Sequence, residues 1–246
     1  MTNEPAGQLT LAIETSNPSS GGEAGVALGR VTRLSVALLA EEPLGPGERH
    51  DDLLMPAIAR LFDRAGARPE QLERLVVSIG PGGYTGLRIA TAAASALSIS
   101  VGPAVIGVPS AWSAARTHAR EHPEGGPFAV ALASKGNACW VTAFDGSGAP
   151  LDTPSGLATG LLCDSDRAME LTEAVGIRLW LGDRFMPERL RAGVLERGGQ
   201  IDEPRFVAST LLGLAWSAAP SPGGVVTPLY GREAEAVTRW REGRRG

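Results

Sequence analysis

A glycine-rich stretch at residues 80–83 has the composition and spacing that most strongly suggest chemistry. An apolar run, residues 75–79, precedes it, and a helix-like run follows it to about Leu97. The first backbone N–H groups of a helix have no internal partner, and glycines let the backbone approach an anion, so this order of elements can bind a phosphate. The spacing matches neither the Gly-x-Gly-x-x-Gly fingerprint nor a Walker loop, so a phosphate site and a structural turn are both open.

A carboxylate at the end of an earlier apolar run is a second candidate for the same chemistry. Glu14 follows residues 9–13 and precedes two hydroxyl side chains. An acidic group at a strand end can orient a metal-bound water beside a nucleotide. Arg88 can hold a phosphate or a partner carboxylate with its planar guanidinium, or can be a solvated charge. The candidate nucleotide- or phosphate-binding residues are Glu14, Thr15, Gly80, Gly82, Gly83 and Thr85.

The three histidines are weaker candidates. His118 and His122 lie four residues apart on one face of an expected helix, as two imidazole ligands of a metal would. His122 stands at the helix end beside Pro123, which favours an ordinary helix-end pair, and no metal site is predicted. His50 precedes two aspartates, whose charges favour its protonated form, either at an interface or at a helix entrance.

Hydrophobic periodicity places these candidates on a mixed α/β framework. The first half predicts strands at residues 9–14, 25–28, 34–40, 75–79 and 104–108, and helices at 50–65, 84–98 and 111–121. Signals in the second half are shorter: a hairpin of 128–134 with 138–144, a strand at 178–182 and a helix at 209–218. This order predicts an antiparallel meander continued by parallel strands, with helices on both faces of the sheet.

The helices expected at 50–65 and 84–98 carry more apolar and small residues than one narrow stripe needs. They can therefore pack against a matching pair of helices from another subunit, as in a four-helix arrangement. Packing against their own sheet is the alternative. The candidate interface residues are His50, Leu54, Ile58, Leu87, Arg88, Ala93 and Leu97.

Composition narrows the class of protein. The chain has 246 residues, 43% of them hydrophobic, and a formal net charge of −4, which argues against a whole-protein electrostatic grip on nucleic acid. No apolar run reaches the ~18–20 residues that span a bilayer, and no signal peptide is visible. Cys139 and Cys163 are not a Cys-x-x-Cys pair, so no disulfide framework is predicted and a cytoplasmic location is expected.

Several ordered strings resemble the TsaB (YeaZ) family. Its opening Asp-Thr-Ser is similar to residues 14–16, and its His-Ser-x-x-Leu-x-Pro segment to residues 50–56. Its Gly-Pro-Gly-Ser-Phe-Thr-Gly-Leu-Arg-Ile-Gly signature resembles residues 80–90, and its Gly-Val-Ser-Ser resembles residues 107–110. A terminal Pro-x-Tyr-x-Arg pattern matches Pro228, Tyr230 and Arg232. The resemblance is dense over residues 9–112 and patchy afterwards.

This resemblance implies a fold of the actin/Hsp70/sugar-kinase (ASKHA) type. Residues 1–109 would form an N-terminal α/β lobe with the partner-binding helices, and residues 110–246 a smaller, divergent α/β lobe. It implies no independent catalysis but a scaffold role beside TsaD, the catalytic paralogue, in transferring threonylcarbamoyl to N6 of adenosine 37 in tRNAs that read A-starting codons. TsaE would join that pair, ATP or ADP could bind at or near the subunit interface, and the free chain could form a homodimer.

Departures from the family pattern keep alternatives open. Glu14 replaces an aspartate, and residues 133–135 replace an Asp-Ala-Arg segment. In the TsaD-type metal site two histidines follow the Gly-Val strand end, and the matching positions here are Ser110 and Ala114, so metallopeptidase activity is not expected. An ATP-dependent kinase or hydrolase of the same fold is the alternative function. The arginines after residue 238 could contact tRNA or form a solvated tail.

Overall fold

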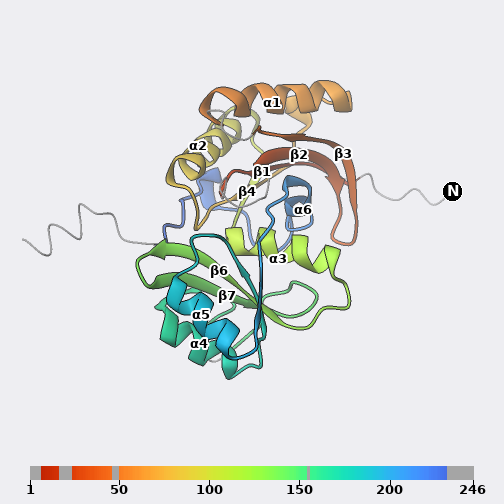
Figure 1. The fold of residues 1–246 in the computed structure, drawn as a ribbon. Helices are drawn as coiled ribbons and strands as arrows, with labels where there is room; N and C mark the ends of the chain where they lie inside the picture. Colours follow the sequence, from red (N-terminus) through yellow and green to blue (C-terminus); the bar gives the residue numbers. More distant parts are fainter. Residues whose placement is uncertain (1–6, 17–23, 46–49, 154–155, 232–246) are drawn as a thin grey trace, which may run out of the picture.

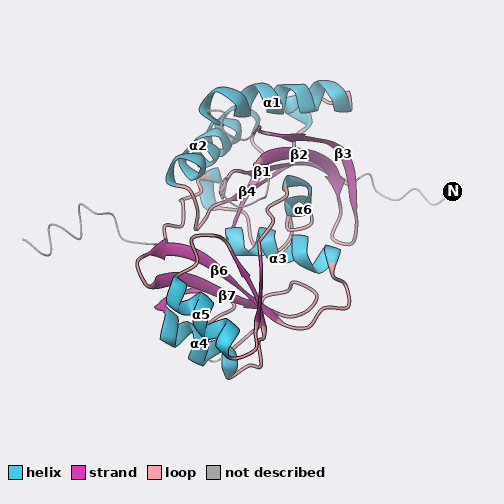
Figure 2. Ribbon diagram, viewed as in Figure 1, coloured by secondary structure: helices cyan, strands magenta, loops and turns pink. Residues whose placement is uncertain are grey.

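The structure is a computed structural model that describes residues 7–16, 24–45, 50–153 and 156–231. Two α/β lobes lie one above the other, each built on a five-stranded mixed sheet (Figure 1). Helices cover the sheets and fill the space between them (Figure 2). Among the described residues, no helix combines the length and the apolar character needed to cross a membrane.

The first sheet begins with a meander and continues with parallel strands. Its strands are β1 (Gln8–Glu14), β2 (Gly25–Val31), β3 (Val36–Pro43), β4 (Arg74–Ser78) and β5 (Ala104–Val108), in the order β3-β2-β1-β4-β5. β1 to β3 pair antiparallel, whereas β1, β4 and β5 pair parallel. The two parallel strands are reached through α1 (His50–Ala65), a short 3-10 turn at Pro69–Gln71, and α2 (Tyr84–Val101).

Successive side chains along each strand point to opposite faces of this sheet, so they belong to two separate hydrophobic cores. Leu11, Ile13 and Leu75 face α1 and α2, whereas Ala12 and Val76 face the opposite side. The opposite side is covered by α6 (Ala208–Leu212), a helix from the far end of the described chain. Because both faces are covered, the strands are buried almost throughout, apart from the edge strand β3.

The second sheet repeats the order and sense of the first. It comprises β6 (Phe128–Lys135), β7 (Ala138–Phe144), β8 (Leu161–Asp164), β9 (Leu179–Gly182) and β10 (Gln200–Asp202), in the order β10-β9-β6-β7-β8. β6 to β8 again form an antiparallel meander, and β9 and β10 continue it in parallel. α4 (Ser165–Glu173) and α5 (Glu188–Glu196) lie together against one face (Figure 1).

The third helix of each lobe crosses to the other lobe. α3 (Ser110–Glu121) follows β5 but packs on β6, while α6 follows β10 and packs on β1 and β2. The two helices meet where the hydroxyls of Thr117 and Thr210 are 3.0 Å apart. After α6, the guanidinium of Arg74 lies 3.5 Å from the ring centre of Trp216, which anchors the returning chain to the first lobe.

The predicted fold class is confirmed, with two mixed-sheet α/β lobes of the ASKHA type. Every strand and helix expected before residue 122 is present, with ends that differ by at most three residues from those expected. β2 and α2 extend three residues further, and β3 begins and ends later. The helix expected at 209–218 is wrong beyond Leu212, where the chain continues as turns at Gly213. β8, α4, α5 and β10 were not predicted, because each has ten residues or fewer and shows little periodicity.

Candidate functional site

The glycine-rich loop packs against the chain's own backbone at the end of β1. The Gly83 N–H donates to the carbonyl of Ser16 at 2.5 Å, and the Thr15 hydroxyl donates to the carbonyl of Gly86 at 2.8 Å. A Cβ atom at Gly82 would collide with the Ser16 carbonyl, and one at Gly86 with the Thr15 carbonyl. These glycines are therefore required by the close approach of two backbone segments.

A third segment closes the loop from the other side. Gly80 has φ +107°, and a Cβ there would collide with the carbonyl of Leu229, whose N–H donates to Ile79 at 2.6 Å. Thr85 is exposed at the start of α2. The described residues of the loop thus do not form an open phosphate cradle. Nucleotide binding here, or at a subunit interface, stays a prediction.

Glu14 faces a buried group of serines. The side chain is 1% exposed, and its Oε1 atom accepts from the N–H and hydroxyl of Ser16 at 2.9 and 2.5 Å. Its Oε2 atom lies near Ser78 and Ser113 without a well-aligned hydrogen bond to either within the described chain. The Ser78 and Ser110 hydroxyls are 2.9 Å apart. Ser78 ends β4, whereas Ser110 and Ser113 lie at the start of α3. No periodicity in the sequence indicated that these serines would meet Glu14.

Burial raises the pKa of Glu14 above its ordinary value of 4.5, and hydrogen bonds from Ser16, Ser113 and Ser78 offset only part of that increase. The folded chain therefore keeps a proton on this carboxyl at pH values where the unfolded chain has lost it. By linkage, the free energy of unfolding falls as pH rises from about the unfolded pKa through the folded pKa.

Replacing Glu14 with glutamine is expected to remove this pH dependence. The amide cannot ionise, so the free energy of unfolding of Glu14→Gln should exceed that of the parent increasingly between pH 4.5 and the raised pKa, and by a constant amount above it. Urea denaturation at several pH values between 4.5 and 8 measures the difference. A difference that is the same at every pH would contradict the buried, neutral carboxyl.

Most of the apolar side chains expected at a partner interface lie in the core instead. Leu54, Ile58 and Leu97 are buried against the sheet, and Leu87 is completely buried. Ala93 is half-buried. These positions are a correction to the expected interface, because a side chain that fills the core cannot also meet a second protein. The helices still present other residues to solvent.

The outer face of α2 is apolar over two turns. Ala92, Ala96 and Ile99 are exposed at positions i, i+4 and i+7, and Ile99 is 88% exposed. Met55 of the neighbouring helix α1 is 47% exposed. Arg88 stands at one end of this stripe and is also exposed. We call Arg88, Ala92, Ala96 and Ile99 the outer stripe of α2.

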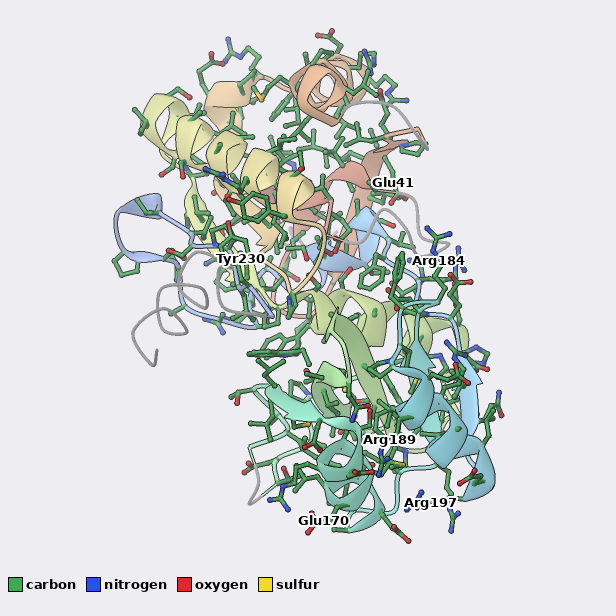
Figure 3. All side chains as sticks on the ribbon, turned by 60° about the vertical axis from the view of Figure 1, so that its left-hand side comes forward. Glu41, Glu170, Arg184, Arg189, Arg197 and Tyr230 are labelled. Carbon is green, nitrogen blue, oxygen red and sulfur yellow. The ribbon has the colours of Figure 1, made fainter. Side chains whose placement is uncertain are left out.

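A tyrosine pair joins the start of α2 to the terminal motif. The Arg88 guanidinium donates to the Tyr84 hydroxyl at 2.7 Å, and the rings of Tyr84 and Tyr230 have centroids 5.4 Å apart. Figure 3 shows Tyr230 beside the first turn of α2. Arg88 is thus held by an aromatic side chain within the described part of the chain, a partner that its sequence position did not reveal.

The remaining candidates that the structure describes are not arranged as a metal-binding site. The rings of His118 and His122 have centroids 4.5 Å apart, and burial, followed by the charge of His122, lowers the pKa of His118. Within the described residues, no three His, Cys, Asp or Glu side chains are placed to hold a metal. The side chains of His50 and of residues 133–135, together with Arg232 and the arginines after residue 238, lie outside what the structure describes.

Comparisons with known proteins agree with the motifs. The family model "TsaD: tRNA N6-adenosine threonylcarbamoyltransferase" matches residues 43–158, just under half of the chain. A TsaB protein, described as a tRNA threonylcarbamoyladenosine biosynthesis protein, from Bacillus subtilis is 35% identical over 91 residues, covering 37% of this chain and 36% of the relative. Uncharacterised proteins of Mycobacterium bovis and Mycobacterium tuberculosis are 33% identical over 98 residues, covering 40% of this chain. That match spans 44%, less than half, of each mycobacterial relative.

Solved structures extend the likeness to the whole fold. YeaZ from Pseudomonas aeruginosa superposes with a TM-score of 0.64 at 20% identity, over 91% of this chain and 99% of that one. A Pseudomonas aeruginosa protein described as similar to peptidase YeaZ has a TM-score of 0.67 at 21% identity, over 92% of this chain and 100% of that one. The predicted resemblance to TsaB (YeaZ) proteins is therefore confirmed, in sequence over part of the chain and in fold over most of it.

Proposed function

We propose that this chain is the TsaB-type, non-catalytic subunit of a complex that transfers threonylcarbamoyl to N6 of adenosine 37 in tRNAs that read A-starting codons. The observation that carries the proposal is the combined likeness to TsaB and YeaZ proteins, in sequence over part of the chain and in fold over most of it. The match to the TsaD family model fits a chain that is a paralogue of the catalytic subunit.

The residues at the expected catalytic position support a non-catalytic role. The two positions that follow the Gly-Val end of β5 are Ser110 and Ala114, and both are buried. Ser110 shares a hydrogen bond with Ser78, and Ala114 packs in the core with Phe128. A hydroxyl already bound within the protein and a methyl group do not supply a strong metal ligand set.

The outer stripe of α2 is the proposed contact with a TsaD-type partner. Small exposed side chains permit close approach of another helix, and an exposed apolar stripe of this kind is typical of an interaction surface. A TsaE-type ATPase would join this pair. A second copy of the chain would occupy the same stripe when the partner is absent, tRNA would be bound by the complex, and the assembly would work in the cytoplasm.

The test is co-expression of the chain with the TsaD-type protein of the same organism, followed by size-exclusion chromatography with light scattering. A 1:1 complex, and tRNA modification that requires both chains, is the expected result. A chain that remains separate from TsaD would contradict the proposal. ATP turnover by the isolated chain would instead support the alternative, a kinase or hydrolase of the same fold.

A further inference from the structure

Two cysteines that are distant in the sequence lie directly opposite each other in the second sheet. β7 and β8 pair antiparallel with Cys139 aligned to Cys163. Cys139 is buried in the core beneath α4 and α5, and Cys163 packs against the same core. The two side chains therefore lie on the same face of the sheet. Both are free thiols in this structure.

The register of this pair gives a Cα spacing that is compatible with a disulfide. Directly opposed residues in antiparallel strands have Cα atoms about 4.5 or 5.5 Å apart, depending on the kind of pair. Disulfides need Cα separations of about 4.4–6.8 Å, so both kinds of pair satisfy the requirement. β8 is a short strand at the sheet edge, so its side chains are more accessible than those of the inner strands.

The surroundings make the two thiols unequal. Cys163 is half-buried, whereas Cys139 is completely buried. A hydrogen bond from the Cys139 thiol lowers the pKa of Cys163, against the opposing effects of burial and of Asp164, and the same bond together with burial raises the pKa of Cys139. Cys163 also directly precedes Asp164, the N-cap of α4, where the positive end of a helix favours a thiolate.

We propose that Cys139 and Cys163 form a redox-active pair that closes to an intrachain disulfide in exchange with low-molecular-weight disulfides. The Cys163 thiolate attacks one sulfur of the small disulfide, forming a mixed disulfide and releasing one small thiolate. Cys139 then loses its proton and attacks the Cys163 sulfur, releasing the second small thiol. One protein disulfide and two small thiols replace two protein thiols and one small disulfide.

Closure would tie the edge strand and the start of α4 to the inner strand β7. β8 is paired with β7, and its side chains Leu161 and Cys163 pack against the core. Ser165, the residue after β8, donates its hydroxyl to the Asn137 Oδ1 atom at 2.6 Å, at the hairpin end of β7. The expected consequence is a higher thermal midpoint for the oxidised chain than for the reduced chain, because the bond restricts the unfolded state.

The experiment uses the purified full chain in buffers with graded ratios of reduced to oxidised glutathione. Samples are quenched with acid and alkylated with iodoacetamide under denaturing conditions. The mass of the intact chain is then measured by mass spectrometry. We expect two alkyl groups in reducing buffer, and none in oxidising buffer, where the chain is lighter by two hydrogen atoms. Two alkyl groups at every ratio, or disulfides only between chains, would overturn the proposal.

Single serine variants separate pairing from simple thiol reactivity. Cys139→Ser should accumulate a glutathione adduct on Cys163 and form no intrachain bond. In Cys139→Ala, which unlike the serine variant has no hydrogen-bond donor at this position, Cys163 should be alkylated in the native state about threefold more slowly than in the parent, because the activating hydrogen bond is lost. An unchanged rate would overturn the assignment of Cys163 as the attacking thiol. Cys163→Ser should carry no adduct, since the buried Cys139 is out of reach.

Discussion

An aspartate at Ala96 is expected to weaken binding to the proposed TsaD-type partner by about 100-fold or more. Ala96 is exposed in the middle of the outer stripe of α2, so the free chain tolerates the charge. Closure of an interface over the stripe would bury an unpaired carboxylate, which costs several kcal/mol. Isothermal titration calorimetry with the purified partner measures the loss.

The matched control is Leu195→Asp, a charge placed at a 56% exposed apolar residue of α5 in the second lobe. It should fold and bind like the parent, because α5 lies away from α2 (Figure 1). Leu97→Asp is unsuitable as a probe, since Leu97 lies in the core and the variant would unfold. If Ala96→Asp and the parent bound the partner with equal affinity, the outer stripe would not be part of the interface.

Alanine at Gly86 is expected to lower the free energy of unfolding by about 2 kcal/mol or more. Gly86 lies inside α2, where replacing glycine with alanine ordinarily gains up to about 1 kcal/mol. Here the added Cβ would collide with the backbone carbonyl of Thr15, and backbone is unable to rotate away as a flexible side chain does. The predicted sign is therefore the reverse of the one that helix propensity gives.

Gly126→Ala is the control for this substitution. Gly126 has open space around its would-be Cβ and is not among the glycines with positive φ. Its free energy of unfolding should change by less than about 0.5 kcal/mol. Urea denaturation of the parent and both variants gives the comparison. A Gly86→Ala chain as stable as the parent would mean that the loop and β1 do not pack as the structure shows.

The sequence predicted the first lobe well because its elements are long and regular. Ala104–Val108 and His50–Ala65 were predicted to the residue, since each carries a clear alternating or helical pattern and ends at Gly or Pro. Elements of the second lobe are shorter and less periodic, and four of them were missed. The sequence named Glu14 and the glycines as candidates but did not show what they contact, and their role in binding a nucleotide or phosphate stays a prediction.

The amino-acid sequence by itself determined the periodic elements, the meander-then-parallel order and the motifs shared with TsaB proteins. Only the tertiary structure decided that Glu14 faces serines and that the glycines make room for neighbouring backbone segments. It also decided that Leu87 lies in the core while Ala96 lies on the surface, and that Cys139 is paired with Cys163. The physical reason is the separation along the chain of the residues that interact. Periodicity reports which face of an element is apolar, whereas burial, pKa and thiol pairing depend on contacts between residues that strand order and register bring together from distant parts of the chain.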